Sequence, residues 1–434
     1  MEEIVVFWFR RDIRLQDNVG LYHAIQTGKK VLPIFIFDPD ILLKFSDKED
    51  KRVVYFYQAL AQINSILKQY NSQVVCYHDR VMTVFEQLVQ THTITAVYTN
   101  ADYEPEARKR DGAVQTFLAQ QQIAFYAYKD QVIFEAHELL KSDQTPYKVY
   151  TPYAKLWRSR LTAQHLLDWT LALKADYFVA KKEDATLPSL ASLGYKTTEE
   201  VHFKSPVFDS HIIQNYTANR DFPALDATTR LGIALRFGTV SVRACVRQAL
   251  QANETWLSQL IWREFFMAIL YHYPYSARAC FKREYENIQW RNNETEFEAW
   301  CKGETGYPLV DAGMRELNQT GYMHNRVRMV VASFLVKHLL IDWRWGEAYF
   351  AQKLNDYDLA LNVGNWQWAA GCGCDAAPYF RIFNPTEQQK KFDKELKYIK
   401  KWIPQYEEST YIPPIVEHKL ARERALVVFK QALK

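Results

Sequence analysis

Residues 4–9 of the chain read IVVFWF, and the charged run RRDIRLQDN follows at residues 10–18. A short, unbroken run of β-branched and aromatic residues is typical of a strand that is buried on both faces, as in a parallel sheet. Similar runs follow at residues 31–37, 73–77, 96–100 and 123–128. Amphipathic, helix-like segments separate them, at residues 18–27, 52–70, 81–91 and 106–120. This alternation predicts βαβ units and a parallel, Rossmann-like sheet covered by helices on both faces.

The charged run after the first strand contains three arginines and two aspartates. It lies at the carboxyl end of a strand, where ligands bind in open α/β sheets. Ion pairs in a domain interface explain the same composition equally well. No glycine-rich phosphate loop follows the strand, which disfavours an ordinary dinucleotide-binding domain.

The strand signals fade after residue 210, and helical patterns replace them at residues 256–271, 307–317, 325–338 and 345–354. Residues 141–211 have poor periodicity and several prolines, which is typical of a connector. We therefore expect an α/β domain over residues 1–130, an interdomain connector over residues 131–210 and an all-helical domain over residues 211–434.

The composition describes an ordinary folded protein of more than one domain. The 434 residues exceed the size at which one hydrophobic core stops growing. Hydrophobic residues make up 48% and charged residues 24%, which excludes a disordered or fibrous chain. Nine of the twelve tryptophans lie in the segment from Trp256 to Trp402. This uneven distribution indicates a specific role for indole side chains there, which the composition alone does not identify.

Charge, cysteine content and targeting signals indicate the kind of partner and the cellular compartment to expect for the protein. Residues 1–150 contain 17 Lys+Arg and 19 Asp+Glu, which leaves 37 and 31 for residues 151–434. That mild basic excess suits a polyanionic partner and suits a solvated surface equally well. The six cysteines have no disulfide or zinc-site spacing, so we expect a reducing compartment and no metal. The N-terminus lacks the features of a signal peptide and the apolar runs are too short to span a bilayer, so we expect a cytoplasmic protein.

Two stretches of the helical part combine aromatic and polar residues. Trp262 precedes Arg263 and Glu264 in an aromatic segment, which suits the rim of a pocket for a flat ring and a phosphate. Residues 355–368 contain aspartates, amides and two indoles. Carboxylates and amides can hydrogen-bond a ring or a ribose, and indoles can stack or transfer electrons. A tightly packed pair of capped helices would also account for this second stretch.

Over essentially its whole length, the chain resembles the photolyase/cryptochrome flavoprotein family, and within it the cyclobutane pyrimidine dimer DNA photolyases. The resemblance extends from Trp8-Phe9-Arg10-Arg11-Asp12 to residues 414–419. Its most specific motifs are WREF at residues 262–265, TGYP at 305–308, MHNR at 323–326 and NWQW at 365–368. The resemblance implies an N-terminal α/β domain with a parallel sheet and an all-helical C-terminal domain that binds FAD.

The family's FAD contacts fall on a defined set of positions. Asn362 would face the flavin N5, and Asp358 would bind the flavin ring. Gly232 stands where a serine is common, which removes one hydroxyl and keeps the backbone donor. The implied FAD contacts are Tyr216, Thr228, Thr229, Arg230, Leu231, Gly232, Trp256, Asn325, Arg328, Asp356, Asp358 and Asn362.

The resemblance also implies light-driven repair of pyrimidine dimers in duplex or single-stranded DNA. An excited, reduced flavin would donate an electron to a flipped-out dimer, with Trp262 and Trp368 as apolar walls of the lesion pocket and Gln259 and Asn362 among the catalytic residues. Trp366, Trp343 and Trp290 would conduct electrons to oxidised flavin. The implied DNA and lesion contacts are Arg220, Gln259, Trp262, Arg263, Asn325, Arg326, Met329, Trp368 and Arg381.

Departures from the family pattern keep alternatives open. Gln259 replaces the glutamate that is usual in cyclobutane-dimer enzymes and resembles the (6-4) photolyases, whereas Asn325 and Met329 follow the cyclobutane-dimer pattern. A (6-4) photolyase and a cryptochrome photoreceptor without repair activity are therefore the alternatives. Ala107 and Ala277 stand where folate-binding relatives have polar or lysine contacts, so a second, antenna chromophore stays unidentified. We expect a monomer with DNA as its partner and no membrane association.

Overall fold

The computed structural model describes residues 2–181, 187–196, 203 and 206–434. The chain divides into two compact units, each made of several segments. The first, which we call the sheet unit, comprises Met1–Glu138, Ser159–Val207 and Arg230–Gln251. The second, the helical unit, comprises Leu139–Arg158, Phe208–Thr229 and Ala252–Lys434. Part of the connector predicted at residues 131–210 lies outside the described residues, and the three predicted domain boundaries stay predictions.

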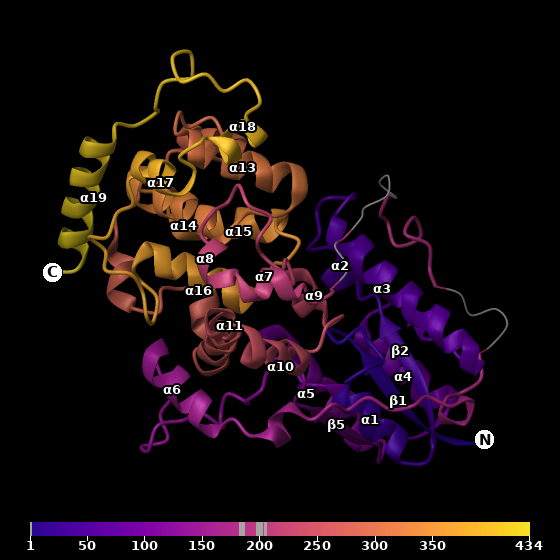
Figure 1. Ribbon diagram of the computed structural model, residues 1–434. Helices are drawn as coiled ribbons and strands as arrows, with labels where there is room; N and C mark the ends of the chain where they lie inside the picture. Colours follow the sequence, from indigo (N-terminus) through magenta and orange to yellow (C-terminus); the bar gives the residue numbers. More distant parts are fainter. Residues whose placement is uncertain (1, 182–186, 197–202, 204–205) are drawn as a thin grey trace. The chain divides into compact units, whose positions relative to one another are not determined.

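The sheet unit contains a five-stranded parallel sheet, as the sequence predicts (Figure 1). Its strand order is β3-β2-β1-β4-β5, with β1 in the centre, where Val6 pairs with Leu32 on one side and Val97 on the other. The five predicted strands are all present, with ends shifted by up to three residues. Their bounds are β1 Glu3–Phe9, β2 Lys30–Ile36, β3 Val75–Tyr77, β4 Thr93–Asn100 and β5 Ala124–Tyr128.

Helices cover both faces of this sheet because β1 is apolar on both sides. Val5, Phe7 and Phe9 belong to one buried cluster, together with residues of α1 and α3. The alternate residues Ile4, Val6 and Trp8 belong to a second cluster with residues of α4 and α5, as the period of two of a strand requires. The helices of this unit are α1 Val19–Gln26, α2 Pro39–Leu42, α3 Lys51–Leu67, α4 Val81–Thr91, α5 Pro105–Gln120, α9 Gly232–Phe237 and most of α10 Val242–Ala252, with 3-10 turns η1 Lys68–Tyr70, η2 Ala163–Leu166 and η3 Ala175–Tyr177.

The charged run after β1 makes ion pairs inside the sheet unit. Arg14 Nη2 lies 2.7 Å from Asp130 Oδ2, and Asp130 is almost completely buried. Arg243 of α10 joins the same carboxylate at 2.8 Å and also contacts Asp17 at 2.8 Å. Burial alone would raise the pKa of Asp130, but Arg14 and Arg243 hold this pKa below its usual value. The ion pairs that the composition suggests are therefore present for these residues, inside the sheet unit.

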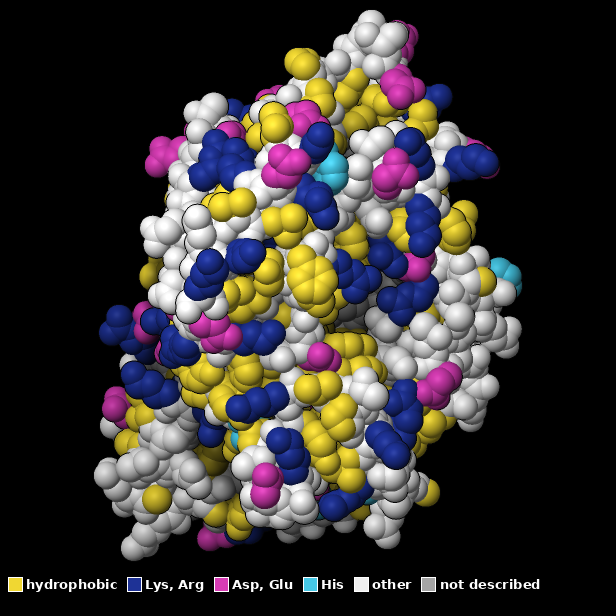
Figure 2. Space-filling view, turned by 90° about the vertical axis from the view of Figure 1, so that its left-hand side faces the viewer, with side chains coloured by type: hydrophobic (Ala, Val, Ile, Leu, Met, Phe, Trp, Pro, Cys, Tyr) yellow, Lys and Arg dark blue, Asp and Glu magenta, His cyan; other side chains and the backbone are white. Residues whose placement is uncertain are grey.

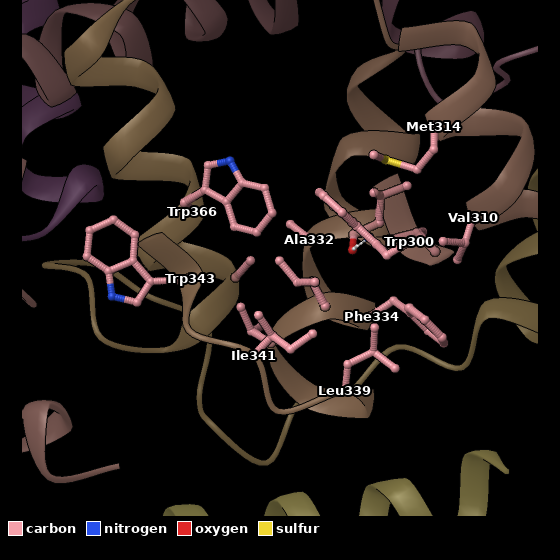
Figure 3. Packing of buried hydrophobic residues seen from close by; sticks show 14 of the residues in the cluster. Trp300, Val310, Met314, Ala332, Phe334, Leu339, Ile341, Trp343 and Trp366 are labelled. Carbon is pink, nitrogen blue, oxygen red and sulfur yellow. Dashed lines mark hydrogen bonds between the residues drawn. The ribbon is translucent and has the colours of Figure 1, made fainter. Parts of the chain in front are cut away.

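The helical unit is built around a large apolar core of aromatic and aliphatic residues (Figure 3). Trp300, Phe334 and Trp343 are almost completely buried in it. The helices of this unit are most of α6 Tyr150–Arg160, α7 Ser210–Gln214, α8 Tyr216–Asn219, α11 Glu254–His272, α12 Glu294–Lys302, α13 Pro308–Thr320, α14 Asn325–Ser333, α15 Trp343–Lys353, α16 Leu359–Ala370, α17 Pro385–Phe392, α18 Lys397–Trp402 and α19 His418–Ala432, with short turns η4 Pro274–Ala277, η5 Arg283–Asn287 and the π-helical η6 Phe334–His338.

One helix with two buried aromatic side chains lies in a stretch where the sequence indicated only a connector. In α6, Tyr153 and Trp157 lie one turn apart and are 2% and 1% exposed. The indole nitrogen of Trp157 donates to Glu264 Oε1 at 2.7 Å. The apolar residues of α6 are too few for a clear helical period, so its contacts with α11 reveal it where the local pattern does not.

Three further features bear on function. No helix of the described residues is long and apolar enough to cross a membrane. Within the same described ranges, no group of three or more His, Cys, Asp or Glu side chains could hold a metal ion. All six cysteines are free thiols.

Candidate flavin and DNA site

Helix α16 carries two of the predicted site residues on one face. Asp358 caps its N-terminus, because the side chain accepts hydrogen bonds from the backbone of Ala360 at 3.1 Å and of Leu361 at 3.3 Å. Asn362 and Trp366 then lie one turn apart, and both are buried. Asp358 therefore has a structural role in this helix in addition to its predicted contact with flavin.

The amide of Asn362 is held by a carboxylate of the neighbouring helix α15. Asn362 Nδ2 donates to Glu347 Oε1 at 2.9 Å and to the backbone oxygen of Glu347 at 3.1 Å. Burial raises the pKa of Glu347. The sequence analysis missed Glu347, whose only signal is its place two residues after the Trp343-Arg344-Trp345 run.

A second cluster joins predicted FAD contacts from distant parts of the sequence. Arg328 Nη2 donates to Asp356 Oδ2 at 2.9 Å, and its Nε donates to the backbone oxygen of Met323 at 2.7 Å. The Arg328 guanidinium also lies 5.8 Å from the ring centroid of Tyr322. The hydroxyls of Tyr322 and Thr228 are 3.1 Å apart. Tyr322, which the sequence analysis did not single out, therefore connects Thr228 to Arg328.

Tyr216 and Trp256 lie near the starts of two helices, α8 and α11, that are hydrogen-bonded to each other. The hydroxyls of Thr217 and Thr255, the residues next to them, are 2.9 Å apart. Trp256 is 5% exposed, and its backbone nitrogen donates to the capping side chain of Asn253 at 3.1 Å.

The predicted phosphate-binding run spans the boundary between the two units. Thr229 ends a segment of the helical unit, and Arg230, Leu231 and Gly232 follow in the sheet unit. Arg230 has a φ of +53°, in the left-handed region, and Gly232 begins α9.

The proposed lesion pocket has one wall that the structure defines closely. The indole of Trp262 stacks on Tyr150, with ring centroids 3.7 Å apart and an interplanar angle of 6°. Gln259 lies one turn before Trp262 on α11, and its Nε2 donates to the backbone oxygen of Thr255 at 3.4 Å. Trp368 is partly buried on α16. Tyr150 escaped the sequence analysis because it precedes Trp262 by more than a hundred residues.

Two of the predicted DNA-contacting arginines share one carboxylate. Arg326 Nη2 lies 2.8 Å from Asp221 Oδ1, and Arg220 Nε lies 3.8 Å from the same atom. Arg381 is exposed, whereas Arg263 is only 7% exposed. Figure 2 shows Lys and Arg side chains spread over one face, with hydrophobic side chains between them.

Asn325 and Met329 lie one turn apart at the start of α14. The amide nitrogen of Asn325 is 4.0 Å from the sulfur of Met329, and Asn325 is exposed. The structure therefore brings these two predicted lesion contacts together on one helix.

The three tryptophans of the predicted electron-transfer chain differ in burial. Trp366 and Trp343 are 3% and 1% exposed in the core shown in Figure 3, and Trp290 is partly buried. Trp366 has ring contacts with Phe350 at 5.0 Å and Trp300 at 6.1 Å between centroids. Trp300 is completely buried and donates its indole N–H to the backbone of Val331 at 3.2 Å, so it has a packing role in this core.

Two family models match the chain. The model described as DNA photolyase matches residues 5–170, and the model described as the FAD binding domain of DNA photolyase matches residues 256–410. The second range contains half of the predicted flavin contacts, including Asn362 and Asp358.

Curated relatives match along nearly the full chain. The deoxyribodipyrimidine photo-lyase of Alkalihalophilus pseudofirmus is 36% identical, and the match covers 99% of this chain and 98% of that protein. The proteins of the same name from Salmonella typhimurium and Escherichia coli are 36% and 34% identical, each over 98% of both chains.

Solved structures agree with this result. A bacterial class III photolyase from Agrobacterium tumefaciens is 30% identical, with a TM-score of 0.87 and coverage of 100% of this chain and 98% of that one. An archaeal photolyase from Sulfolobus tokodaii, solved with two FAD molecules, is 34% identical, with a TM-score of 0.86 over 99% and 100% of the two chains. A cryptochrome from Synechocystis, 23% identical over 98% and 99% with a TM-score of 0.82, shares the fold. The sheet, the helical unit and matches along the whole chain agree, and the protein belongs to the photolyase/cryptochrome flavoprotein family.

Proposed function

We propose that the protein is a deoxyribodipyrimidine photo-lyase, a light-driven enzyme that splits cyclobutane pyrimidine dimers in DNA. The observation that carries the proposal is the full-length match to relatives of that name at 34–36% identity. The residues that the chemistry needs lie in the segment matched by the FAD-binding family model, apart from those of residues 216–232.

The side chains present fit FAD. Asn362 offers a buried amide whose nitrogen is already bound by Glu347, which leaves its oxygen for a ring N–H. Arg328 and Asp356 form an ion pair beside Tyr322, and the hydroxyl of Thr228 lies next to the hydroxyl of Tyr322. These charged and hydroxyl groups together suit a phosphate and a ribose. When bound and reduced, FAD supplies under blue light the electron that opens the cyclobutane ring, and the electron afterwards returns to it.

The chain's own residues would bind and orient the DNA. Arg220, Arg326 and Arg381 would contact phosphates and fix the register without reading sequence. Trp262, which Tyr150 supports by stacking, would form with Trp368 the apolar walls around the extruded dimer. Such base–aromatic stacking contributes about 1–3 kcal/mol per base. Gln259 would donate its amide N–H to a pyrimidine carbonyl.

The buried tryptophans have a separate task in the proposal. Trp366, Trp343 and Trp290 would carry electrons from the surface to oxidised flavin and so return it to the reduced state. Light-driven reduction and repair are then different processes, and only the first depends on these indoles.

The partner, the oligomeric state and the compartment of the enzyme are also part of what we propose. The partner is DNA that contains pyrimidine dimers, the oligomeric state is a monomer, and the compartment is the cytoplasm. The Sulfolobus tokodaii photolyase was solved with two FAD molecules, which implies a novel light-harvesting cofactor in that protein. For this chain, the class of any antenna chromophore stays unassigned.

The test is to illuminate the reduced protein with DNA that contains either one cyclobutane dimer or one (6-4) product, and to follow the loss of each lesion. We expect loss of the cyclobutane dimer only. Loss of the (6-4) product alone would assign the protein to that class, and loss of neither lesion would favour a photoreceptor. A dark sample of each mixture is the control for light dependence.

A further inference from the structure

Tyr150 covers one face of the indole of Trp262. The two rings are nearly parallel, with an interplanar angle of 6° and centroids 3.7 Å apart. Phe265 meets the same indole edge-on, at 5.7 Å between centroids and an interplanar angle of 82°. The indole cannot rotate without losing both contacts, so Tyr150 and Phe265 fix its orientation.

Tyr150 is itself fastened to helix α11, which carries Trp262. Its hydroxyl donates to the backbone oxygen of Ser258 at 3.1 Å. Arg158, near the other end of α6, donates to the Ser258 hydroxyl at 2.9 Å and to Glu254 Oε1 at 2.8 Å. Because α6 is bound to α11 near both of its ends, the ring of Tyr150 is held in place against the helix on which Trp262 lies.

The backbone of Tyr150 connects this wall to a second segment of the proposed DNA site. Its N–H donates to Asp375 Oδ2 at 2.9 Å. Asp375 lies in the sequence between Trp368, the other proposed wall of the lesion pocket, and Arg381, a proposed DNA contact. All of these residues belong to the helical unit. The first residue of α6 therefore joins the Trp262 wall to the segment that carries Trp368 and Arg381.

We propose that Tyr150 is a positioning residue for lesion recognition, which fixes the indole of Trp262 and ties it to the segment that carries the opposite wall. This role rests on the proposed function, which makes Trp262 a wall of the lesion pocket. An intact base pair is more costly to extrude than a damaged one, so undamaged DNA rarely reaches this wall. Tyr150 should therefore strengthen the binding of dimer-containing DNA and have no effect on the binding of undamaged DNA.

The test is the dissociation constant of the FAD-loaded protein for two fluorescent oligonucleotides in darkness, one with a single cyclobutane thymine dimer and one undamaged. Tyr150→Ala removes the stacking partner, and we expect the affinity for dimer DNA to fall about fivefold, the size of one aromatic pair, with no change for undamaged DNA. Tyr150→Phe keeps the ring and should restore the affinity for dimer DNA. Tyr126→Ala, at an exposed tyrosine of β5, is the matched control and should change neither affinity.

The link to the opposite wall has its own pair of variants. Asp375→Ala removes the acceptor of the Tyr150 N–H, and we expect the affinity for dimer DNA to fall. Asp375→Asn keeps an acceptor oxygen and should bind dimer DNA more tightly than D375A. The two variants have the same charge, so the difference between them measures the hydrogen bond and not the removal of a carboxylate next to DNA. Equal dimer binding by folded D375A and D375N would overturn the coupling of the two walls.

A double-mutant cycle with Trp262 distinguishes positioning from a direct contact between Tyr150 and DNA. If Tyr150 acts through Trp262, Tyr150→Ala should have no further effect on dimer binding in the Trp262→Ala background. A further loss there, an equal loss for both DNAs, or unaltered dimer binding by folded Y150A would overturn the inference. Tyr150→Leu, which keeps an apolar side chain without a ring, makes the same comparison if Y150A does not fold. An unmodified protein that binds both DNAs equally would overturn the proposed function as well.

Discussion

Gly346 of α15 lies directly against the indole of Trp366 on α16. A Cβ built on Gly346 would be 2.1 Å from Trp366 Cη2 and 2.5 Å from Leu335 Cδ2, far inside any ordinary contact. The approach of the two helices therefore depends on the absence of a side chain at position 346, and it brings Glu347 to Asn362.

Replacement of Gly346 by alanine should destabilise the helical unit. Because the core around Trp366 is closely packed, we expect Gly346→Ala to lower the unfolding free energy by about 1–3 kcal/mol, the usual cost of overpacking. Thermal unfolding followed by tryptophan fluorescence measures the effect. Gly112→Ala is the matched control, since Gly112 is an exposed position of α5 with nothing within 4 Å of a new Cβ, and it should raise stability by about 0.5–1 kcal/mol. Equal stability of G346A and the unmodified protein would contradict this account of the packing.

His324 should make the stability depend on pH. Its ring nitrogen Nδ1 caps α14 by accepting the backbone N–H of Arg326 at 3.1 Å. Burial, helped by the charge of Arg328, lowers the pKa of His324 to about 4. Between the ordinary pKa of about 6.5 and pH 4, the unfolded chain binds a proton that the folded one does not, so stability falls as pH falls, by up to about 3 kcal/mol over the window.

Asn is a good capping residue that does not titrate, so His324→Asn should keep the cap and reduce this loss. The measurement is the thermal midpoint at pH 7 and at pH 5 for both proteins. Buried His338, whose pKa is lowered to about 3 by burial, contributes to the slope of both proteins and cancels in the comparison. An equal drop between the two pH values in H324N would show that His324 is not responsible.

Trp366 should be needed for light-driven reduction of the flavin and dispensable for repair. We expect Trp366→Phe to slow photoreduction of bound FAD at least tenfold, because an indole of the proposed electron-transfer chain is lost, while chemically pre-reduced enzyme repairs DNA at a near-normal rate. Trp300→Phe is the control, since Trp300 is equally buried and contacts Trp366 at 6.1 Å between centroids. It should lower stability without stopping photoreduction. Equal loss of photoreduction and repair in W366F would contradict the assigned roles.

Gln259 should contribute one hydrogen bond to the lesion. Gln259→Ala should weaken binding of dimer-containing DNA about fivefold, which corresponds to the net value of about 1 kcal/mol for one hydrogen bond. Gln259→Glu restores the residue usual in cyclobutane-dimer enzymes, so we expect binding at least as tight as that of the unmodified protein. Gln289→Ala, at an exposed position, serves as the control. Unchanged binding by Q259A in a titration with fluorescent DNA would remove Gln259 from the site.

The parallel sheet could be predicted from the sequence because each strand carries its own signal. Residues 4–9 are apolar on both faces, and this requires helices on both sides whatever the rest of the chain does. Helix α6 could not be predicted, since Tyr153 and Trp157 become core residues only through their contacts with Glu264 and Phe265 of α11.

The candidate site likewise contains residues that the sequence could predict and residues that it could not. Trp262 stands in a recognisable motif and Asn362 lies three residues before another, so family resemblance identifies them as candidates. Glu347 and Tyr150 support them from other segments, and each is an ordinary residue in its own sequence context. Such partners are determined by the packing of helices, which a single sequence does not specify.

The central claim is that the protein uses light and reduced FAD to split cyclobutane dimers. The most direct measurement is the recovery of intact thymines from a short oligonucleotide with one cyclobutane thymine dimer, mixed with reduced protein under blue light and in darkness. The account predicts that every dimer is restored to two thymines under light, over many turnovers, with no recovery in the dark. Dimers that persist under light in the presence of folded, FAD-loaded, reduced protein would contradict it.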